Sequence, residues 1–413
     1  LWDFSQVTDG KNTPVGKVTV PSCWESYPGF EAYRGQGLYE RNFEADGDMR
    51  IVFKGVSHTA KVFVDDKFVC EHYNAFTQFE AVVKNLPSGV HKLSVLVDNS
   101  FSEASALHVE NDYQSYGGIS RGVMIEQLPK HYIKQLHFTP VCKDDTWYAQ
   151  LELVIASLDG KPWKGKVSVS LKGCDDVNEN VLYTQSCSTG AGELVLKSDL
   201  IACENAKPWA PEHPTLYMLS AQLEDEDGKV IDDLTDRVGF REVRTQGKDI
   251  LLNGKKLQIK GFCRHEDAVG RASALLPEDY RMDMELIKES GATAMRLAHY
   301  PHAEPMYDLS DENGIILWTE IPMCGPGGQA FTGFVDTEGY KDNARLAVKE
   351  LVYQKFNHPS ICFWGICNEI LVSDGKRFVE YDNPIPFIKE LNGIYKSIDS
   401  SRLTALATCV DQS

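Results

Sequence analysis

The sequence predicts a multidomain protein in which two β-sandwiches precede a (β/α)8 TIM barrel, with about five of its eight strands present. A length of 413 residues exceeds what one hydrophobic core usually serves. Short strands separated by turns fill the first 240 residues, and strand and helix then alternate five times. We therefore expect domains at 1–129, 130–240 and 241–413.

Residues 1–129 consist of short segments in which apolar and polar residues alternate. Met49, Ile51 and Phe53 show this period of two, which is typical of strands with one buried face. Residues 111–121, Asn-Asp-Tyr-Gln-Ser-Tyr-Gly-Gly-Ile-Ser-Arg, hold the acidic, basic, aromatic and glycine residues that a sugar-contacting loop would use. An ordinary turn with a surface ion pair is an equal alternative for this loop.

Residues 130–240 form a second β-rich segment. Its expected strands are 148–155, 166–171, 194–196 and 216–223. About 110 residues of short strands indicate a sandwich of immunoglobulin type. It holds no cluster of reactive side chains, so we expect a spacer or packing role.

From residue 241 the sequence changes to the strand–helix rhythm of a parallel sheet covered by helices. The expected strands are 257–262, 293–297, 315–322, 360–370 and 403–407. Pro277 begins the first helix, whose apolar stripe is Met282, Leu286 and Ile287. An open doubly wound sheet is the alternative, but no glycine-rich phosphate loop follows the first strand. A barrel that stops after its fifth strand fits better.

Polar side chains follow the first four of these strands, and strand ends of a parallel barrel converge on one mouth. They are Arg264, His265, Glu266, Arg296, His299, Glu320, Asn368 and Glu369. Each histidine alone is as readily a packed residue as a ligand contact. Together the set favours an active site built from carboxylates, imidazoles and an amide.

Two carboxyl groups across a scissile bond are the arrangement that glycosidases use, and a separation of roughly 5–5.5 Å permits a covalent glycosyl intermediate. The sequence shows no Gly-x-Ser-x-Gly motif and no phosphate cradle. Trp318 and Trp364 could offer stacking faces to a sugar, although core packing is the commoner fate of a tryptophan on a strand.

Four motifs of the barrel segment resemble glycoside hydrolase family 2, the family of β-galactosidases, β-glucuronidases and β-mannosidases. They are Arg264-His-Glu-Asp267, Arg296-Leu-Ala-His-Tyr-Pro301, Asn357-His-Pro-Ser360 and Trp364-Gly-Ile-Cys-Asn-Glu369. The resemblance covers essentially the whole chain and implies an N-terminal jelly-roll sugar-binding-like domain, an immunoglobulin-like domain and the catalytic barrel.

The resemblance also implies roles for single residues. Glu369 matches the general acid/base, Asn368 the residue that bonds the sugar 2-hydroxyl, and His265 and His299 the contacts to the glycone. The remaining expected substrate-binding residues are Asp112, Glu320, Arg296 and Trp364. Family members with a Mg²⁺ site carry a histidine soon after the strand-three glutamate. Glu320-Ile-Pro-Met-Cys-Gly-Pro has none, so we expect no metal or other cofactor.

The family's nucleophile is a glutamate on strand seven, which we expect to lie beyond the end of this chain, leaving the chain alone without normal turnover. The expected function is a retaining exo-β-glycosidase that hydrolyses terminal β-D-galactosides in oligosaccharides or glycoconjugates. A β-glucuronidase of the same family is the alternative. A non-catalytic carbohydrate-binding protein is the alternative from another class.

Composition indicates which classes of partner and which compartment to expect. The formal charge of −18 argues against a nucleic-acid partner, and no apolar run is long enough to predict a membrane span. The 11 scattered cysteines favour reduced thiols and thus a bacterial cytoplasm. Because the chain begins at Leu1 without Met, a removed signal peptide stays an alternative. The oligomeric state is open, with a homo-oligomer as one option.

Overall fold

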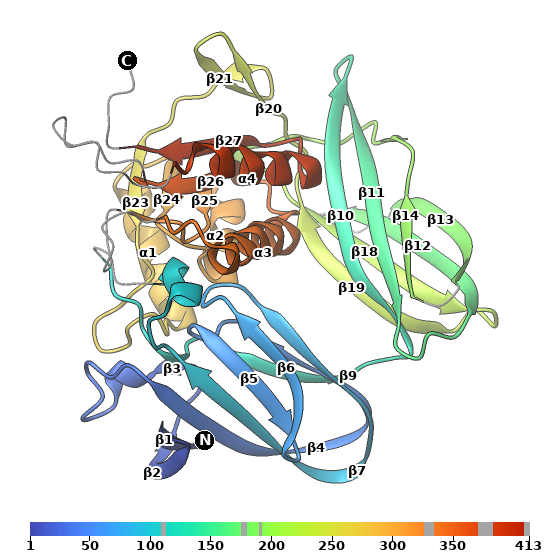
Figure 1. Cartoon of the computed structure of the whole chain (residues 1–413). Helices are drawn as coiled ribbons and strands as arrows, with labels where there is room; N and C mark the ends of the chain where they lie inside the picture. The colour runs from blue at the N-terminus through green and yellow to red at the C-terminus, as the bar shows by residue number, and fades with distance from the viewer. Residues whose placement is uncertain (109–112, 175–179, 190–191, 326–333, 371–382, 409–413) are drawn as a thin grey trace, which may run out of the picture.

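The structure is a computed structural model that describes residues 1–108, 113–174, 180–189, 192–325, 334–370 and 383–408. Figure 1 shows three parts: an N-terminal sandwich in blue, a second sandwich mainly in green, and a parallel sheet with helices in yellow to red. Helix α3 (Glu338–Lys355) of the third part lies between its sheet and the N-terminal sandwich, whereas α4 (Ile385–Ile398) lies beside β26 and β27 (Figure 1).

The N-terminal part is built on an antiparallel sheet with the strand order β2-β1-β4-β7-β5-β6, to which β9 adds through β4. These strands are β1 (Trp2–Thr8), β2 (Lys11–Val18), β4 (Gln36–Phe53), β5 (Thr59–Val64), β6 (Lys67–Tyr73), β7 (Phe79–Asp98) and β9 (Val123–Gln127). A small sheet pairs β3 (Ser22–Cys23) with β8 (Gly118–Ile119). Met49, Ile51 and Phe53 are buried in its core, as their alternation predicts.

The second part has two antiparallel sheets that share one hydrophobic core. One contains β10 (His131–Lys143), β11 (Thr146–Ser157), β14 (Glu193–Lys197) and β15 (Ile201–Ala202). The other contains β12 (Trp163–Gly173), β13 (Asn180–Thr189), β18 (Tyr217–Asp225) and β19 (Val230–Val238). Alternate residues of β11 and β12 face each other across this core, which is the packing of a sandwich.

The third part begins with a small antiparallel sheet and continues as a five-stranded parallel sheet in chain order. The antiparallel strands are β20 (Val243–Gln246), β21 (Asp249–Leu252) and β22 (Lys255–Lys256). The parallel strands are β23 (Gly261–Arg264), β24 (Ala294–Leu297), β25 (Ile316–Glu320), β26 (Ile361–Asn368) and β27 (Leu403–Ala407). The helices are α1 (Pro277–Glu289), α2 (Glu304–Asn313), α3 (Glu338–Lys355) and α4 (Ile385–Ile398).

Two details of this part differ from the prediction. The first parallel strand is Gly261–Arg264 rather than 257–262, because Leu257 still belongs to the preceding hairpin and donates its N–H to Ile250. On α1, Met282 and Leu286 are 56% and 57% exposed, and the buried stripe is Tyr280, Met284 and Ile287. The helix is turned so that Tyr280, rather than a purely apolar side chain, reaches inward.

Both sandwiches are fixed to the third part by half-buried polar contacts near α3. Glu350 of α3 accepts hydrogen bonds from His72, Asn74 and Thr77 of the N-terminal sandwich, with Thr77 Oγ1 at 2.6 Å. Asn357, just after α3, donates to the Leu136 carbonyl at 2.8 Å and accepts from Phe138 N–H at 2.9 Å. The orientation of each sandwich is therefore tied to the segment that leads into β26.

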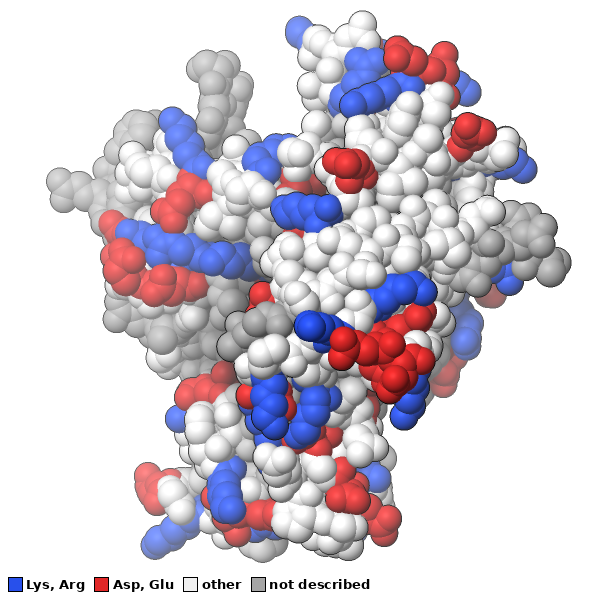
Figure 2. Space-filling view, turned by 90° about the vertical axis from the view of Figure 1, so that its right-hand side faces the viewer, with Lys and Arg blue, Asp and Glu red and all other residues white. Residues whose placement is uncertain are grey.

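The surface carries charges of both signs. Figure 2 shows acidic and basic groups interspersed among uncharged areas on one face, without a continuous basic band on that face. Among the described residues, no helix is long and apolar enough to cross a membrane. The cysteines that the structure describes are all free thiols.

Candidate active site

The inner faces of the five parallel strands line a hollow of about 540 Å³. Trp318 of β25 and Phe363 of β26 lie in it, together with Arg296 of β24, whose guanidinium carbon lies 4.8 Å from the Trp318 ring centroid. Gly365 of β26 makes this crowding tolerable, since a Cβ there would lie 2.3 Å from the Glu320 Cβ and 2.5 Å from the Trp318 Nε1. The polar residues of the site lie where these strands end.

Trp364, which the sequence predicts as a substrate contact, lies on the opposite face of β26 from Phe363 and Gly365. Its side chain is fully buried against Tyr395 of α4, and its indole N–H donates to Asp399 at 2.8 Å. Neighbouring residues of a strand point to opposite faces, and Trp364 takes the face covered by helices. It supports the site only through the core.

Glu320 is the buried centre of the polar network. Its Oε1 accepts from Arg296 Nη2 at 2.8 Å and from His299 Nδ1 at 2.9 Å, and its Oε2 accepts from Arg296 Nε at 3.0 Å. The same Arg296 Nη2 donates to Asn368 Oδ1 at 2.8 Å. Glu320 is 0% exposed and both its oxygens accept hydrogen bonds, so it holds Arg296 and His299 in place.

Asn368 and Glu369 form a tightly held strand end. Asn368 donates its N–H to the Met323 carbonyl at 2.9 Å, and Glu369 donates its N–H to the Ala407 carbonyl at 2.9 Å. Glu369 is half-buried and adopts φ = 52°, the left-handed region that side chains with a Cβ seldom occupy. Such a conformation costs on the order of 1 kcal/mol and is found where function requires a particular side-chain placement.

Tyr113 of the N-terminal part packs near His265 and His299, the two histidines that follow β23 and β24 at the open end of the sheet (the mouth). The His265 and His299 rings lie 5.1 Å apart between centroids, and the Tyr113 ring lies 5.4 Å from the first and 5.9 Å from the second. His265 is half-buried and His299 is 8% exposed. Asp112, which the sequence predicts as a substrate contact from this loop, lies outside the residues that the structure describes.

Two further aromatic residues near the histidines were not predicted as site residues. Tyr300 follows His299 directly, and its hydroxyl lies 3.4 Å from His265 Nδ1. Phe76, in the turn between β6 and β7, stacks on Tyr300 with centroids 4.1 Å apart and planes at 10°. Tyr300 lies within a recognised motif and could have been chosen from sequence, whereas the Phe76 turn carries no local signal.

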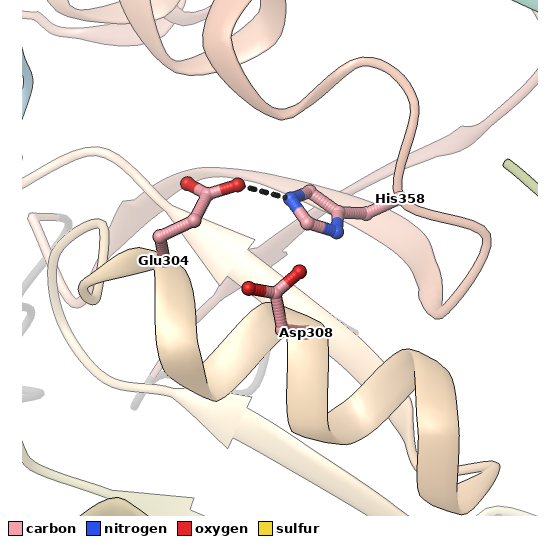
Figure 3. A group of neighbouring side chains, drawn as sticks. All are labelled: Glu304, Asp308 and His358. Atoms are coloured by element: carbon pink, nitrogen blue, oxygen red, sulfur yellow. Dashed lines mark hydrogen bonds and ion pairs between the residues drawn. The ribbon is translucent and has the colours of Figure 1, made fainter. Parts of the chain in front are cut away.

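A separate group of metal-binding residue types, Glu304, Asp308 and His358, lies near the opposite end of β26 (Figure 3). His358 Nε2 donates to Glu304 at 3.0 Å, and its Nδ1 donates to Asp311 at 2.6 Å. Burial alone would lower the His358 pKa, but the two carboxylates outweigh it and raise the pKa to about 10. Both ring nitrogens of His358 are hydrogen-bonded to carboxylates, Lys355 pairs with Glu304, and Arg237 pairs with Asp308, so this group forms an ion-pair network.

Family models match nearly the whole chain. The sugar-binding domain of glycosyl hydrolases family 2 matches residues 10–129, the family's second domain matches 131–241, and its TIM barrel domain matches 243–412. These matches confirm the predicted fold class and the resemblance on which the site residues were chosen.

Solved structures and curated proteins of the same family are similar to this chain over nearly its whole length. A crystal structure of a GH2 β-galacturonidase from Eisenbergiella tayi bound to galacturonate has a TM-score of 0.90 and 42% identity, covering 99% of this chain and 70% of that one. A β-glucuronidase from Bacteroides fragilis is 32% identical over 96% of this chain and 58% of its own length. A β-galactosidase from Thermoanaerobacter pseudethanolicus is 28% identical over 94% and 51%. The chain thus spans between half and three fifths of these two curated relatives, and it belongs to glycosyl hydrolases family 2.

Proposed function

We propose that this protein is a retaining exo-β-glycosidase in which Glu369 is the general acid/base. In the first step Glu369 would give its proton to the glycosidic oxygen while the C1–O bond breaks and a second carboxylate attacks C1. In the second step Glu369 would take a proton from the water that hydrolyses this glycosyl ester. We assign the second carboxylate to none of the described residues. The strand-end position and left-handed backbone of Glu369 support its role.

The Arg296 contact suggests how Asn368 would bind the sugar. Arg296 donates to Asn368 Oδ1, so the side-chain amide must present its NH₂ group outward from that contact. Its protein partner there is the Cys324 sulfur at 3.2 Å, which is a weak acceptor. The NH₂ group is therefore well suited to donate to a sugar 2-hydroxyl, a contact that strengthens in the transition state of glycosidases.

We propose a D-galacto-configured glycone, with β-galacturonides first and β-galactosides second. The observation that carries this choice is the 42% identity with the E. tayi β-galacturonidase, against 32% and 28% for the curated β-glucuronidase and β-galactosidase. A β-glucuronide differs from a β-galacturonide at C4 alone, so β-glucuronidase activity is the alternative.

The test uses protein expressed from the complete coding sequence. It would be assayed with 4-nitrophenyl β-D-galacturonide, galactoside, glucuronide and mannoside, and the anomer of the product would be read by proton NMR. We expect the galacturonide to give the highest kcat/KM with a β-anomeric first product. Preference for glucuronide would refute the glycone assignment, and an α-anomeric product would refute the retaining mechanism. Binding of galacturonate without turnover of any substrate would favour a carbohydrate-binding protein.

Glu369→Gln tests the acid role separately. For substrates with a poor leaving group, kcat/KM should fall by about 10³-fold, within the range that general acid catalysis contributes. A 2,4-dinitrophenyl glycoside needs little protonation, so the first step with it should slow less than tenfold. Equal losses on both substrates would contradict the role of Glu369 as the acid.

A further inference from the structure

Arg121 crosses from the N-terminal sandwich into the barrel part and is 9% exposed. Its Nη2 donates to Glu266 Oε2 at 2.5 Å and to the Pro301 carbonyl at 2.8 Å, and its Nη1 donates to the Phe76 carbonyl at 2.5 Å. The fold makes room for it at Gly55, where a Cβ would lie 2.7 Å from the Arg121 Cδ. One side chain thus joins three segments that are far apart in the sequence.

Glu266 is the barrel residue that receives this arginine. It is 1% exposed, and its Oε1 accepts from the Tyr280 hydroxyl at 2.8 Å and from the Ala303 N–H at 2.7 Å. Burial would raise its pKa, but Arg121, then His302 and Arg264, outweigh burial and lower the pKa to about 2. Glu266 is therefore ionised, and its carboxylate is held by Arg121, Tyr280 and the Ala303 N–H.

The contacts of Arg121 lie within two residues of both histidines, His265 and His299. Glu266 directly follows His265, and its N–H donates to the Tyr300 hydroxyl at 3.1 Å. Pro301, whose carbonyl Arg121 binds, is two residues after His299. Arg121 therefore anchors both chain segments whose side chains meet as the His265–His299 pair.

We propose that Arg121 of the sugar-binding domain is a positioning residue for the active site, holding His265 and His299 through Glu266 and the Pro301 carbonyl. This inference rests on the proposed function of the mouth. The N-terminal domain would then support catalysis by holding the two histidine segments of the barrel in place. Arg121 itself contacts backbone and a buried carboxylate, so its action is indirect.

The alternative is that Arg121 serves only to neutralise a buried carboxylate. The two roles separate in a double variant. Arg121→Met leaves Glu266 buried and unpaired, which destabilises the fold in either case. Adding Glu266→Gln removes that charge and keeps a carbonyl oxygen for Tyr280 and Ala303, so stability should recover, whereas the link to the two histidine segments stays broken.

The experiment compares Arg121→Met, Arg121→Lys and Arg121→Met/Glu266→Gln with wild type in protein from the complete coding sequence. Arg50→Met is the matched control, because Arg50 pairs with Glu126 and Glu80 within the same sandwich. Melting temperature, kcat and KM on 4-nitrophenyl β-galacturonide, and hydrogen exchange of peptides 265–276 and 298–303 are measured for each.

We expect Arg121→Met to lower kcat by about 100-fold, as expected for a small misplacement of catalytic groups, with a smaller change in KM. Hydrogen exchange in both peptides should become faster in Arg121→Met. Arg50→Met should change neither kcat nor the exchange of these peptides. The double variant should regain melting temperature but keep the loss in kcat, and Arg121→Lys should fall between. Recovery of kcat together with melting temperature in the double variant would overturn the inference. So would an Arg121→Met variant with the kcat and the hydrogen exchange of wild type.

The exchange measurement separates this inference from the proposed function. If wild type hydrolyses no β-glycoside, the proposed function fails, yet faster exchange of both peptides in Arg121→Met would still show that Arg121 holds these segments. If wild type is active and Arg121→Met exchanges like wild type, the positioning role fails and the proposed function stands.

Discussion

His358 is a buried cation that is predicted to stabilise the base of the barrel. It donates to Asp311 at 2.6 Å and to Glu304 at 3.0 Å, and its pKa is raised from 6.5 to about 10. A raised pKa contributes stability that is complete below the unfolded pKa and is lost as the pH rises through the folded one. At about 1.4 kcal/mol for each pKa unit, the contribution at pH 7 is roughly 4 kcal/mol. His358→Gln should lower the free energy of unfolding at pH 7 by about 3–5 kcal/mol.

The assay is urea unfolding of wild type and His358→Gln between pH 5.5 and pH 10.5, followed by tryptophan fluorescence. The difference between the two proteins should be largest near pH 6 and should shrink steadily towards pH 10. His91→Gln is the control, since His91 bonds the largely exposed carboxylate of Asp65 at 2.7 Å, and this substitution should lower the free energy of unfolding much less than His358→Gln does. A loss in His358→Gln below 1 kcal/mol, or a difference that does not vary with pH, would refute the reasoning.

Four further experiments distinguish residues that affect the rate of hydrolysis from residues that affect stability. Gly365→Ala should lower kcat/KM by about 100-fold, because a Cβ there would lie 2.3 Å from the Glu320 Cβ; steady-state kinetics would show this. Trp364→Phe removes the bond to Asp399 and should cost about 2 kcal/mol in urea unfolding with KM unchanged. Asn357→Ala should loosen the second sandwich, read as faster hydrogen exchange in β10. Dialysis against EDTA should leave the rate of hydrolysis unchanged, since both ring nitrogens of His358 are bonded to carboxylates and Glu304 also pairs with Lys355.

Most of the fold could be predicted because local patterns agree with the tertiary structure. The apolar run of β26 is buried at every position, and the alternation at Met49, Ile51 and Phe53 matches the core. The stripe of α1 could not be predicted by counting apolar residues, because Tyr280 takes an inward position through its hydroxyl bond to Glu266. A buried polar partner from another element decides which face of that helix is covered.

The site was harder to predict from the sequence than the fold. Strand alternation assigns Trp364 and Asn368 to the same face of β26, yet Trp364 faces α4 and Asn368 meets Arg296 of the inner network. The pairing of β26 with β27 shifts register between Gly365 and Asn368, and this irregularity changes the face. The contribution of Phe76 comes from another domain and carries no local signal, whereas Tyr113 lies in the loop 111–121 that the sequence does indicate.

One of the four motifs that carry the family resemblance makes structural contacts in all its polar positions. In Asn357-His-Pro-Ser360, Asn357 bonds the second sandwich, His358 pairs with α2, and the Ser360 N–H donates to Asp311 at 3.0 Å. These contacts fix where β26 begins, and a strand of eight residues then fixes where it ends, at Asn368. A motif whose side chains are engaged in structural contacts can therefore be as informative about the candidate site as the proposed acid, because it sets the position from which Glu369 is presented.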